Sequence, residues 1–293
     1  MDKFEVKDGV AIIPEGITEI GEDTFYNCSS LESVIIPESV EVIGECAFYN
    51  CESLKSITLP ESVTKIGDNA FGSCTSLESI TLPDSVASIG WYAFTGCTSL
   101  KNITLPDSVT FLGENAFSHC TSLESITISK SVKEIGHYAF DGCSLLKSII
   151  IPESVKEIGI GAFRWCTALE SITLPESVTR IGCYAFMGCT SLKNITIPES
   201  VTRIEQNAFK GCTSLTNVAI PESVREIEEY AFEGCTSLTT VILPVRMKEI
   251  NLTAFYKCPS LSTIYVPAEK TDYYKELLPE KLHGKIVELA PEK

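Results

Sequence analysis

The chain has 293 residues, a hydrophobic fraction of 44% and a formal net charge of −16 at pH 7. This acidic balance argues against nucleic acid and anionic membranes as partners, because both favour clustered Lys and Arg. No apolar run is long enough to span a bilayer, and residues 1–7 lack the apolar stretch of a secretion signal. The sequence leaves two locations open: the cytoplasm, or the cell surface or exterior if a leader has been trimmed.

The first predicted element is a hairpin over residues 4–13, with the sequence FEVKDGVAII. Its centre, Asp8-Gly9, is typical of a two-residue hairpin turn. We expect residues 1–14 to cap the N-terminal end of the structure that follows, because an uncapped apolar end would aggregate.

Residues 15–267 repeat with a period of 23. One phenylalanine recurs at this spacing throughout the segment: Phe25, Phe48, Phe71, Phe94, Phe117, Phe140, Phe163, Phe186, Phe209, Phe232 and Phe255. Self-similarity at such a period is the signature of a solenoid, in which each unit buries its apolar side chains against its neighbours.

One unit shows how each coil should fold. Residues 100–105 alternate apolar and polar side chains, which predicts a short strand, and Pro106 ends it. Val109 and Leu112 point inward again on the opposite wall. Ala116–Phe117 suits a single helical turn. We therefore predict a solenoid of about eleven coils, with one continuous parallel sheet on one face, short strands, turns and single helical turns on the other, and a cap at each end.

Residues 268–293 depart from the repeat. Residues 269–278 have a helical composition, Pro279 ends that helix, and residues 285–289 (KIVEL) can add a last strand. These features predict a C-terminal cap made of a helix and a strand.

The repeat resembles the BspA-like (Treponema pallidum-type) leucine-rich repeat family over residues 10–267. The resemblance rests on the unit PESVTxIGxxAFxGCTSLxSITL. Where ordinary leucine-rich repeats carry an Asn ladder, this chain has serines such as Ser85, Ser108 and Ser177. The resemblance implies a parallel solenoid, and a role in surface adhesion or protein interaction.

A second period of 46 residues is superimposed on the first. The residue after the repeat leucine alternates in charge through Glu32, Lys55, Glu78, Lys101, Glu124, Lys147, Glu170 and Lys193. Duplication of two-repeat blocks is the simplest explanation. Opposite charges on adjacent strands also attract each other, although an exposed pair contributes only about 0–1 kcal/mol.

Eleven of the thirteen cysteines form a ladder of one per repeat. Zinc sites require ligands gathered at one point, and cysteines pointing the same way suit disulfide geometry badly. We therefore expect a reduced ladder of buried thiols. Cys46 and Cys183 lie outside the ladder, and we expect them to be the more reactive thiols.

No pattern in the sequence predicts catalysis, a cofactor or a metal site. The acids that follow the strands form a column that would at most bind a cation weakly, and no calcium-binding loop occurs. His119, His137 and His283 occupy different slots of the repeat, without partners for nucleophilic catalysis.

The candidate contact residues are departures from the repeat and exposed strand positions. Trp91 and Phe111 occupy slots that are mostly polar, in consecutive repeats. Trp165 is a candidate for a second apolar group with Ile160 and Met187. On the strand face the candidates are Thr104 and Thr127 with the flanking Lys101 and Glu124. Exposed aromatics are enriched in binding hot spots, whereas a flat polar face suits a broad ligand.

These features favour a non-enzymatic binding module for a protein or another polymer. The alternative is an architectural spacer with no ligand of its own, capable of weak self-association.

Overall fold

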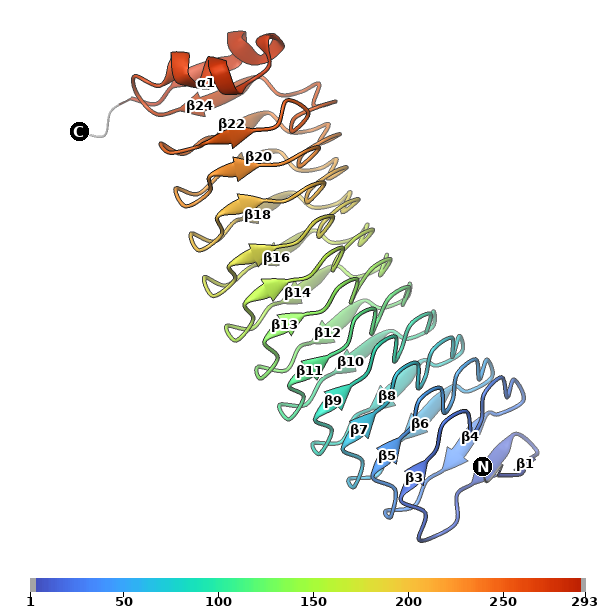
Figure 1. The fold of residues 1–293 in the computed structure, drawn as a ribbon. Helices are drawn as coiled ribbons and strands as arrows, with labels where there is room; N and C mark the ends of the chain where they lie inside the picture. Colours follow the sequence, from blue (N-terminus) through green and yellow to red (C-terminus); the bar gives the residue numbers. More distant parts are fainter. Residues whose placement is uncertain (1–3, 291–293) are drawn as a thin grey trace.

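The computed structural model describes residues 4–290 and shows an elongated stack of coils with the two ends of the chain at opposite ends of the stack (Figure 1). Each coil contributes one strand to each of two walls, and we name each coil after its phenylalanine. The predicted solenoid fold is therefore confirmed. Residues 1–3 and 291–293 of the predicted caps lie outside the described residues.

Strands of three or four residues form wall 1, and strands of two residues form wall 2. Wall 1 contains β2 (Val10–Ile12), β4 (Ser33–Ile35), β6 (Ser56–Thr58), β8 (Ser79–Thr81), β10 (Asn102–Thr104), β12 (Ser125–Thr127), β14 (Ser148–Ile150), β16 (Ser171–Thr173), β18 (Asn194–Thr196), β20 (Asn217–Ala219), β22 (Thr240–Ile242) and β24 (Thr263–Val266). Wall 2 contains β3 (Glu19–Ile20), β5 (Val42–Ile43), β7 (Lys65–Ile66), β9 (Ser88–Ile89), β11 (Phe111–Leu112), β13 (Glu134–Ile135), β15 (Glu157–Ile158), β17 (Arg180–Ile181), β19 (Arg203–Ile204), β21 (Glu226–Ile227) and β23 (Glu249–Ile250).

Neighbouring coils pair in parallel and in register, so that each residue faces its counterpart 23 positions away. The pairing is not continuous along either wall. Wall 1 pairs in four groups, and wall 2 in three: β3 to β11, β13 to β17, and β19 to β23. The single uninterrupted sheet that the sequence predicts is therefore divided, although both walls run the full length of the stack (Figure 1).

The segment around Ala-Phe is not the predicted helical turn. In the Phe94 coil, the amides of Phe94 and Gly96 donate to the next coil, whereas those of Thr95 and Cys97 donate within their own coil. The φ angle is positive at Tyr92 (58°) and Gly96 (69°). A helix would need every amide to bond within the coil at negative φ; here alternate amides join one coil to the next.

The core is a column of phenylalanine rings flanked by two ladders. Successive rings stack with centroids 5.2–5.8 Å apart. The thiol of each ladder cysteine from Cys51 onward donates to the phenylalanine carbonyl 26 residues earlier, at 3.1–3.2 Å. Serine hydroxyls likewise donate to the carbonyl 22 residues earlier, as Ser85 does to Val63 at 2.6 Å. In this chain, serine hydroxyls therefore join consecutive coils at the position where ordinary leucine-rich repeats carry an Asn ladder.

Different structures cover the two ends. At the N-terminus, β1 (Val6–Lys7) and β2 form the predicted hairpin, and Phe4 lies 6.1 Å from Phe25, centroid to centroid. At the C-terminus, α1 (Thr271–Leu277) and a 3-10 helix (Glu280–Lys285) precede β25 (Ile286–Glu288), which pairs with β24. The buried Tyr274 hydroxyl donates to the Pro244 carbonyl, which fixes α1 to the last coils.

Candidate functional site

The wall 1 face carries four of the predicted contact residues. Thr104 and Thr127 are exposed and face each other across β10 and β12. Lys101 does not pair with Glu124: its ammonium lies 3.0 Å from Glu78, and Glu124 lies 3.8 Å from Lys147. The predicted attraction between alternating charges is therefore present, as separate exposed pairs.

This face is less uniformly polar than the flat polar surface predicted from the sequence. The threonine slot carries isoleucine at Ile12, Ile35, Ile150 and Ile242, and the Ile150 side chain is 83% exposed. The signal was present in the sequence, since these isoleucines interrupt the run of threonines. Single exposed apolar residues are ordinary on protein surfaces. Ile12 and Ile35 are cross-strand neighbours, whereas Ile150 and Ile242 lie apart from them along the stack.

Trp91 and Phe111 lie together on the wall 2 side. They are 51% and 49% exposed, and both line a hollow of about 280 Å³ with Thr110, Leu112, Glu114, Lys133, Glu134 and Gly136. The hollow spans the Phe94, Phe117 and Phe140 coils. The structure thus brings together the two aromatic residues that the sequence singled out.

The hollow lies where the stack is loosest. The amide of Gly113 donates to Ile89 at 2.9 Å, whereas that of Gly136 makes no corresponding bond to Leu112 among the bonds of the described residues. The Phe117 and Phe140 rings are 5.8 Å apart, the largest spacing in the column. The junction between these two coils is therefore partly open. We call it the first opening.

The sequence signal for this opening is Ser129, which replaces the repeat proline. Its hydroxyl accepts a bond from the Ser131 amide at 3.1 Å. Within the described residues, the Ser131 hydroxyl donates no bond to the Phe117 coil, so one bond of the serine ladder is missing there. The replacement is visible in the sequence, but the loosened junction could not be derived from it.

Wall 2 has a second opening between β17 and β19. Glu205 here replaces the corner glycine. A Cβ on the equivalent Gly182 would lie 2.9 Å from backbone of the preceding coil. Glu228 and Asn251 occupy the same slot in the next two coils, where their amides keep their bonds to Ile204 and Ile227, so the side chain alone does not open the wall. Arg180 binds Glu205 at 2.8 Å and lies 3.7 Å from Glu157.

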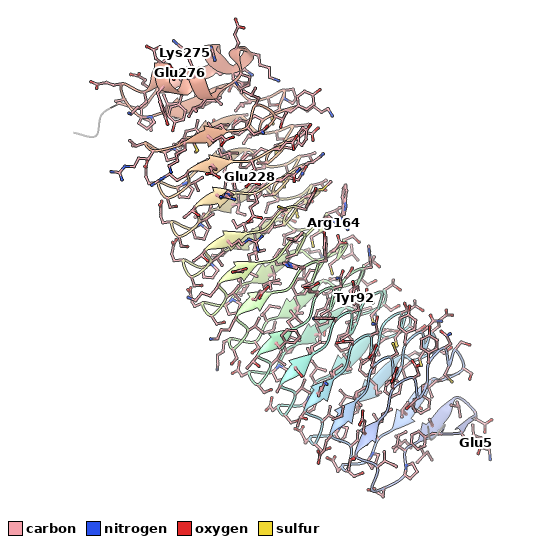
Figure 2. The ribbon with its side chains drawn as sticks, in the orientation of Figure 1. Glu5, Tyr92, Arg164, Glu228, Lys275 and Glu276 are labelled. Atoms are coloured by element: carbon pink, nitrogen blue, oxygen red, sulfur yellow. The ribbon has the colours of Figure 1, made fainter. Side chains whose placement is uncertain are left out.

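Trp165 lies apart from the Trp91–Phe111 hollow, on the corner formed by the Ala-Phe segments. Its amide donates to Met187 at 2.7 Å, and its ring lies so close over Gly188 that a Cβ there would be 2.3 Å away. Arg164 binds the buried Asp141 through two bonds, at 2.9 and 2.7 Å. Figure 2 shows Arg164 and Tyr92 along the same edge of the stack.

The thiols differ in exposure. All thirteen are free, and Cys28, Cys46 and Cys183 are only partly buried. Burial, followed by nearby carboxylates, raises the pKa of Cys46, and burial and Glu205 raise that of Cys183 to about 11. The two off-ladder thiols are therefore accessible but poorly ionised. Sequence reasoning missed that Cys28, at the end of the ladder, is accessible as well.

Within residues 4–290, no group of three or more His, Cys, Asp or Glu side chains is arranged to hold a metal ion. Across the same residues, no helix is long and apolar enough to cross a membrane. The hollow described above gathers aromatic rings and exposed charges in one place.

The BspA type leucine rich repeat region model matches residues 10–84, 64–166 and 156–278. A leucine-rich repeat protein from Bacteroides ovatus is 28% identical, with a TM-score of 0.60 over 96% of this chain and 92% of that chain. A leucine rich cell surface protein from Faecalibacterium prausnitzii is 32% identical, with a TM-score of 0.56 over 87% and 78%.

The pneumococcal vaccine antigen PcpA, 24% identical with a TM-score of 0.64 over 96% of this chain and 79% of that chain, shares the fold. The comparison with curated proteins finds no match. The matched family model spans nearly all of the repeats. The chain therefore belongs to the BspA-type leucine-rich repeat family.

Proposed function

We propose that this chain is a binding module for a protein partner and that the Trp91–Phe111 hollow is its principal contact. The observation that carries the proposal is the position of two large, half-exposed rings around one hollow. Tryptophan is among the residues most enriched in binding hot spots, and such residues act most strongly when a partner fills the space between them.

The family supports this proposal, because its repeats form extended surfaces suited to large partners. The F. prausnitzii relative is described as a cell surface protein, which favours a surface or secreted setting for this chain too. The competing contact is the wall 1 face around Thr104 and Thr127, where Lys101, Glu124 and the exposed Ile150 lie nearby.

Two double variants separate the surfaces. Trp91→Ser/Phe111→Lys removes the rings, and Thr104→Arg/Thr127→Arg places bulk on wall 1. Both should keep the wild-type circular dichroism spectrum, because all four side chains are exposed. Capture of purified extracellular-matrix proteins on a sensor surface is the measurement.

Loss of capture in the first variant alone would support the hollow, and loss in the second alone would move the contact to wall 1. If both variants bind like the wild type, or if no matrix protein binds, the binding proposal fails. Concentration-dependent association of the wild type in sedimentation would then favour the architectural, self-associating alternative.

A further inference from the structure

We infer that the Trp91–Phe111 hollow receives an arginine side chain of the partner, an inference that rests on the binding function proposed above. The lining combines two aromatic rings with two exposed carboxylates, Glu114 and Glu134. A cation over an aromatic face is attracted by the ring quadrupole, most strongly over tryptophan. Carboxylates beside the rings add direct charge complementarity.

The groups that would meet the cation have no partner of their own in residues 4–290. In those residues, neither Glu114 nor Glu134 forms an ion pair. No Lys or Arg side chain there lies over the ring of Trp91 or Phe111. Lys133 also lines the hollow and likewise forms no ion pair among those residues. Its charge would compete with an incoming guanidinium.

The first opening supplies acceptors as well. In most coils the carbonyls of wall 2 accept amides of the next coil, as Ile66 accepts Gly90 at 2.9 Å. At the first opening, the carbonyls of Thr110 and Leu112 accept no hydrogen bond from any described residue. Both residues line the hollow. A guanidinium has five N–H donors, enough to bind carboxylates and carbonyls together.

The second opening shows how this solenoid fills such a gap. Arg180 occupies the slot that Phe111 has three coils earlier, and its guanidinium lies between Glu205 and Glu157. There the chain supplies the cation itself. At the first opening the same slot carries the Phe111 ring. Within residues 4–290, no guanidinium pairs with Glu114 or Glu134 there.

Arginine fits this lining better than lysine or an apolar side chain. Its planar guanidinium can stack on a ring while it forms two parallel bonds to a carboxylate, whereas an ammonium is a compact and strongly hydrated charge. An apolar side chain would leave Glu114 and Glu134 without compensation. The net charge of −16 also favours encounter with basic partners.

The test uses the full chain carrying Trp165→Phe, so that Trp91 is the only tryptophan. The probes are acetyl-Gly-Ser-X-Ser-Gly-amide peptides, with X as arginine, citrulline, lysine or leucine, and Trp91 fluorescence reports binding. Citrulline keeps the shape of arginine and removes its charge. The arginine peptide should bind at least about tenfold more tightly than the citrulline peptide, because charge-assisted bonds are the stronger ones.

Four further variants locate the effect, with nuclear magnetic resonance shifts of the labelled peptide as a second readout. Phe111→Ser and Glu134→Gln should each weaken arginine binding several-fold, and Lys133→Gln should strengthen it. Glu153→Gln removes an exposed carboxylate elsewhere and should leave binding unchanged. Equal loss in Glu134→Gln and Glu153→Gln would reveal a general charge effect and overturn the inference.

The remaining outcomes also decide. Equal binding of arginine and citrulline, or tighter binding of lysine or leucine, would overturn the arginine assignment. If matrix-protein capture still depended on Trp91 and Phe111, the proposed binding function would stand without the arginine assignment. If the arginine peptide binds as expected but capture never occurs, the pocket is supported and the proposed protein partner is not.

Discussion

At the scale of the residue, the phenylalanine column holds the solenoid together. Most of these rings, from Phe48 to Phe232, are fully buried and stack on both neighbours. A ring removed from this column leaves a cavity that two walls of short strands cannot readily close. The free energy of unfolding should therefore be most sensitive at these positions.

Phe140→Ala should lower the free energy of unfolding by about 3–5 kcal/mol, through lost burial and the cavity that remains. Urea denaturation followed by circular dichroism measures the loss. Thr104→Ala, on the exposed face, is the matched control and should change stability by no more than about 0.5 kcal/mol. A loss below about 1 kcal/mol for Phe140→Ala would mean that the column does not carry the core.

Thiol labelling should separate the cysteines into two classes. Cys28, Cys46 and Cys183 should react in the native protein, and the buried ladder thiols only after unfolding. Because the pKa of Cys183 is raised to about 11, its labelling rate should rise about tenfold per pH unit between pH 8 and pH 10, following its thiolate fraction. Mass spectrometry of labelled peptides makes the assignment. Rapid native labelling of Cys97 or Cys143 would contradict the buried ladder.

At the scale of the element, bulky side chains in one coil cover glycines in the next. Trp165 lies over Gly188, Tyr138 over Gly161, and Tyr49 over Gly72. A Cβ on these glycines would lie 2.3–2.8 Å from the ring above it. At these three places the ring, as it lies, leaves no room for a side chain in the next coil. The slots do not require alternation everywhere, since Tyr26 and Tyr49 stack in consecutive coils with centroids 5.2 Å apart.

Gly188→Ala should destabilise the protein by about 1–3 kcal/mol through overpacking against Trp165, with a further cost from the positive φ of 76°. Trp165→Ser removes the clash, so the double variant should recover the overpacking part and retain the backbone cost. Urea denaturation of the four proteins in a double-mutant cycle tests this coupling. Strict additivity would show that the ring does not contact Gly188.

Much of this architecture could be predicted from the sequence, because the same local pattern of residues recurs in eleven repeats. The strands, the proline corners, the buried column, the N-terminal hairpin and the C-terminal helix followed from periodicity and turn chemistry. The Ala-Phe segment did not, since its alternating pattern of amide bonds depends on carbonyls of the next coil. The same holds for the first opening: Ser129 marked an irregular coil, but only three-dimensional packing shows which bonds are lost. Trp91 and Phe111 could be paired because their slots are fixed by the repeat.

At the scale of the whole molecule, the two openings divide wall 2 into three blocks of strands. Each coil touches only its neighbours, so stability depends on the interfaces between consecutive coils. The interface between the Phe117 and Phe140 coils lacks a serine-ladder bond and wall 2 backbone bonds that other junctions have. It should therefore be the weakest interior interface of the stack.

Native-state hydrogen exchange should reveal this weakness. The amides of Lys133 and Gly136 should exchange rapidly, while those of Gly90 and Gly113, which are bonded at 2.9 Å, should be protected. Exchange at single-residue resolution by nuclear magnetic resonance gives the comparison within one molecule. Equal protection at Gly113 and Gly136 would show that the junction is closed in solution.

The position of the two ends has a mechanical consequence. Since they lie at opposite ends of the stack (Figure 1), tension applied between them acts along the axis and loads the bonds that join one coil to the next. Those bonds would fail a few at a time, beginning at the first opening or at an end, and each released coil of 23 residues would lengthen the molecule by roughly 70–80 Å. A protein held at a surface while its partner is pulled away would thus yield in small steps, and the hydrogen bonds of the coils still folded would limit the force that reaches the contact.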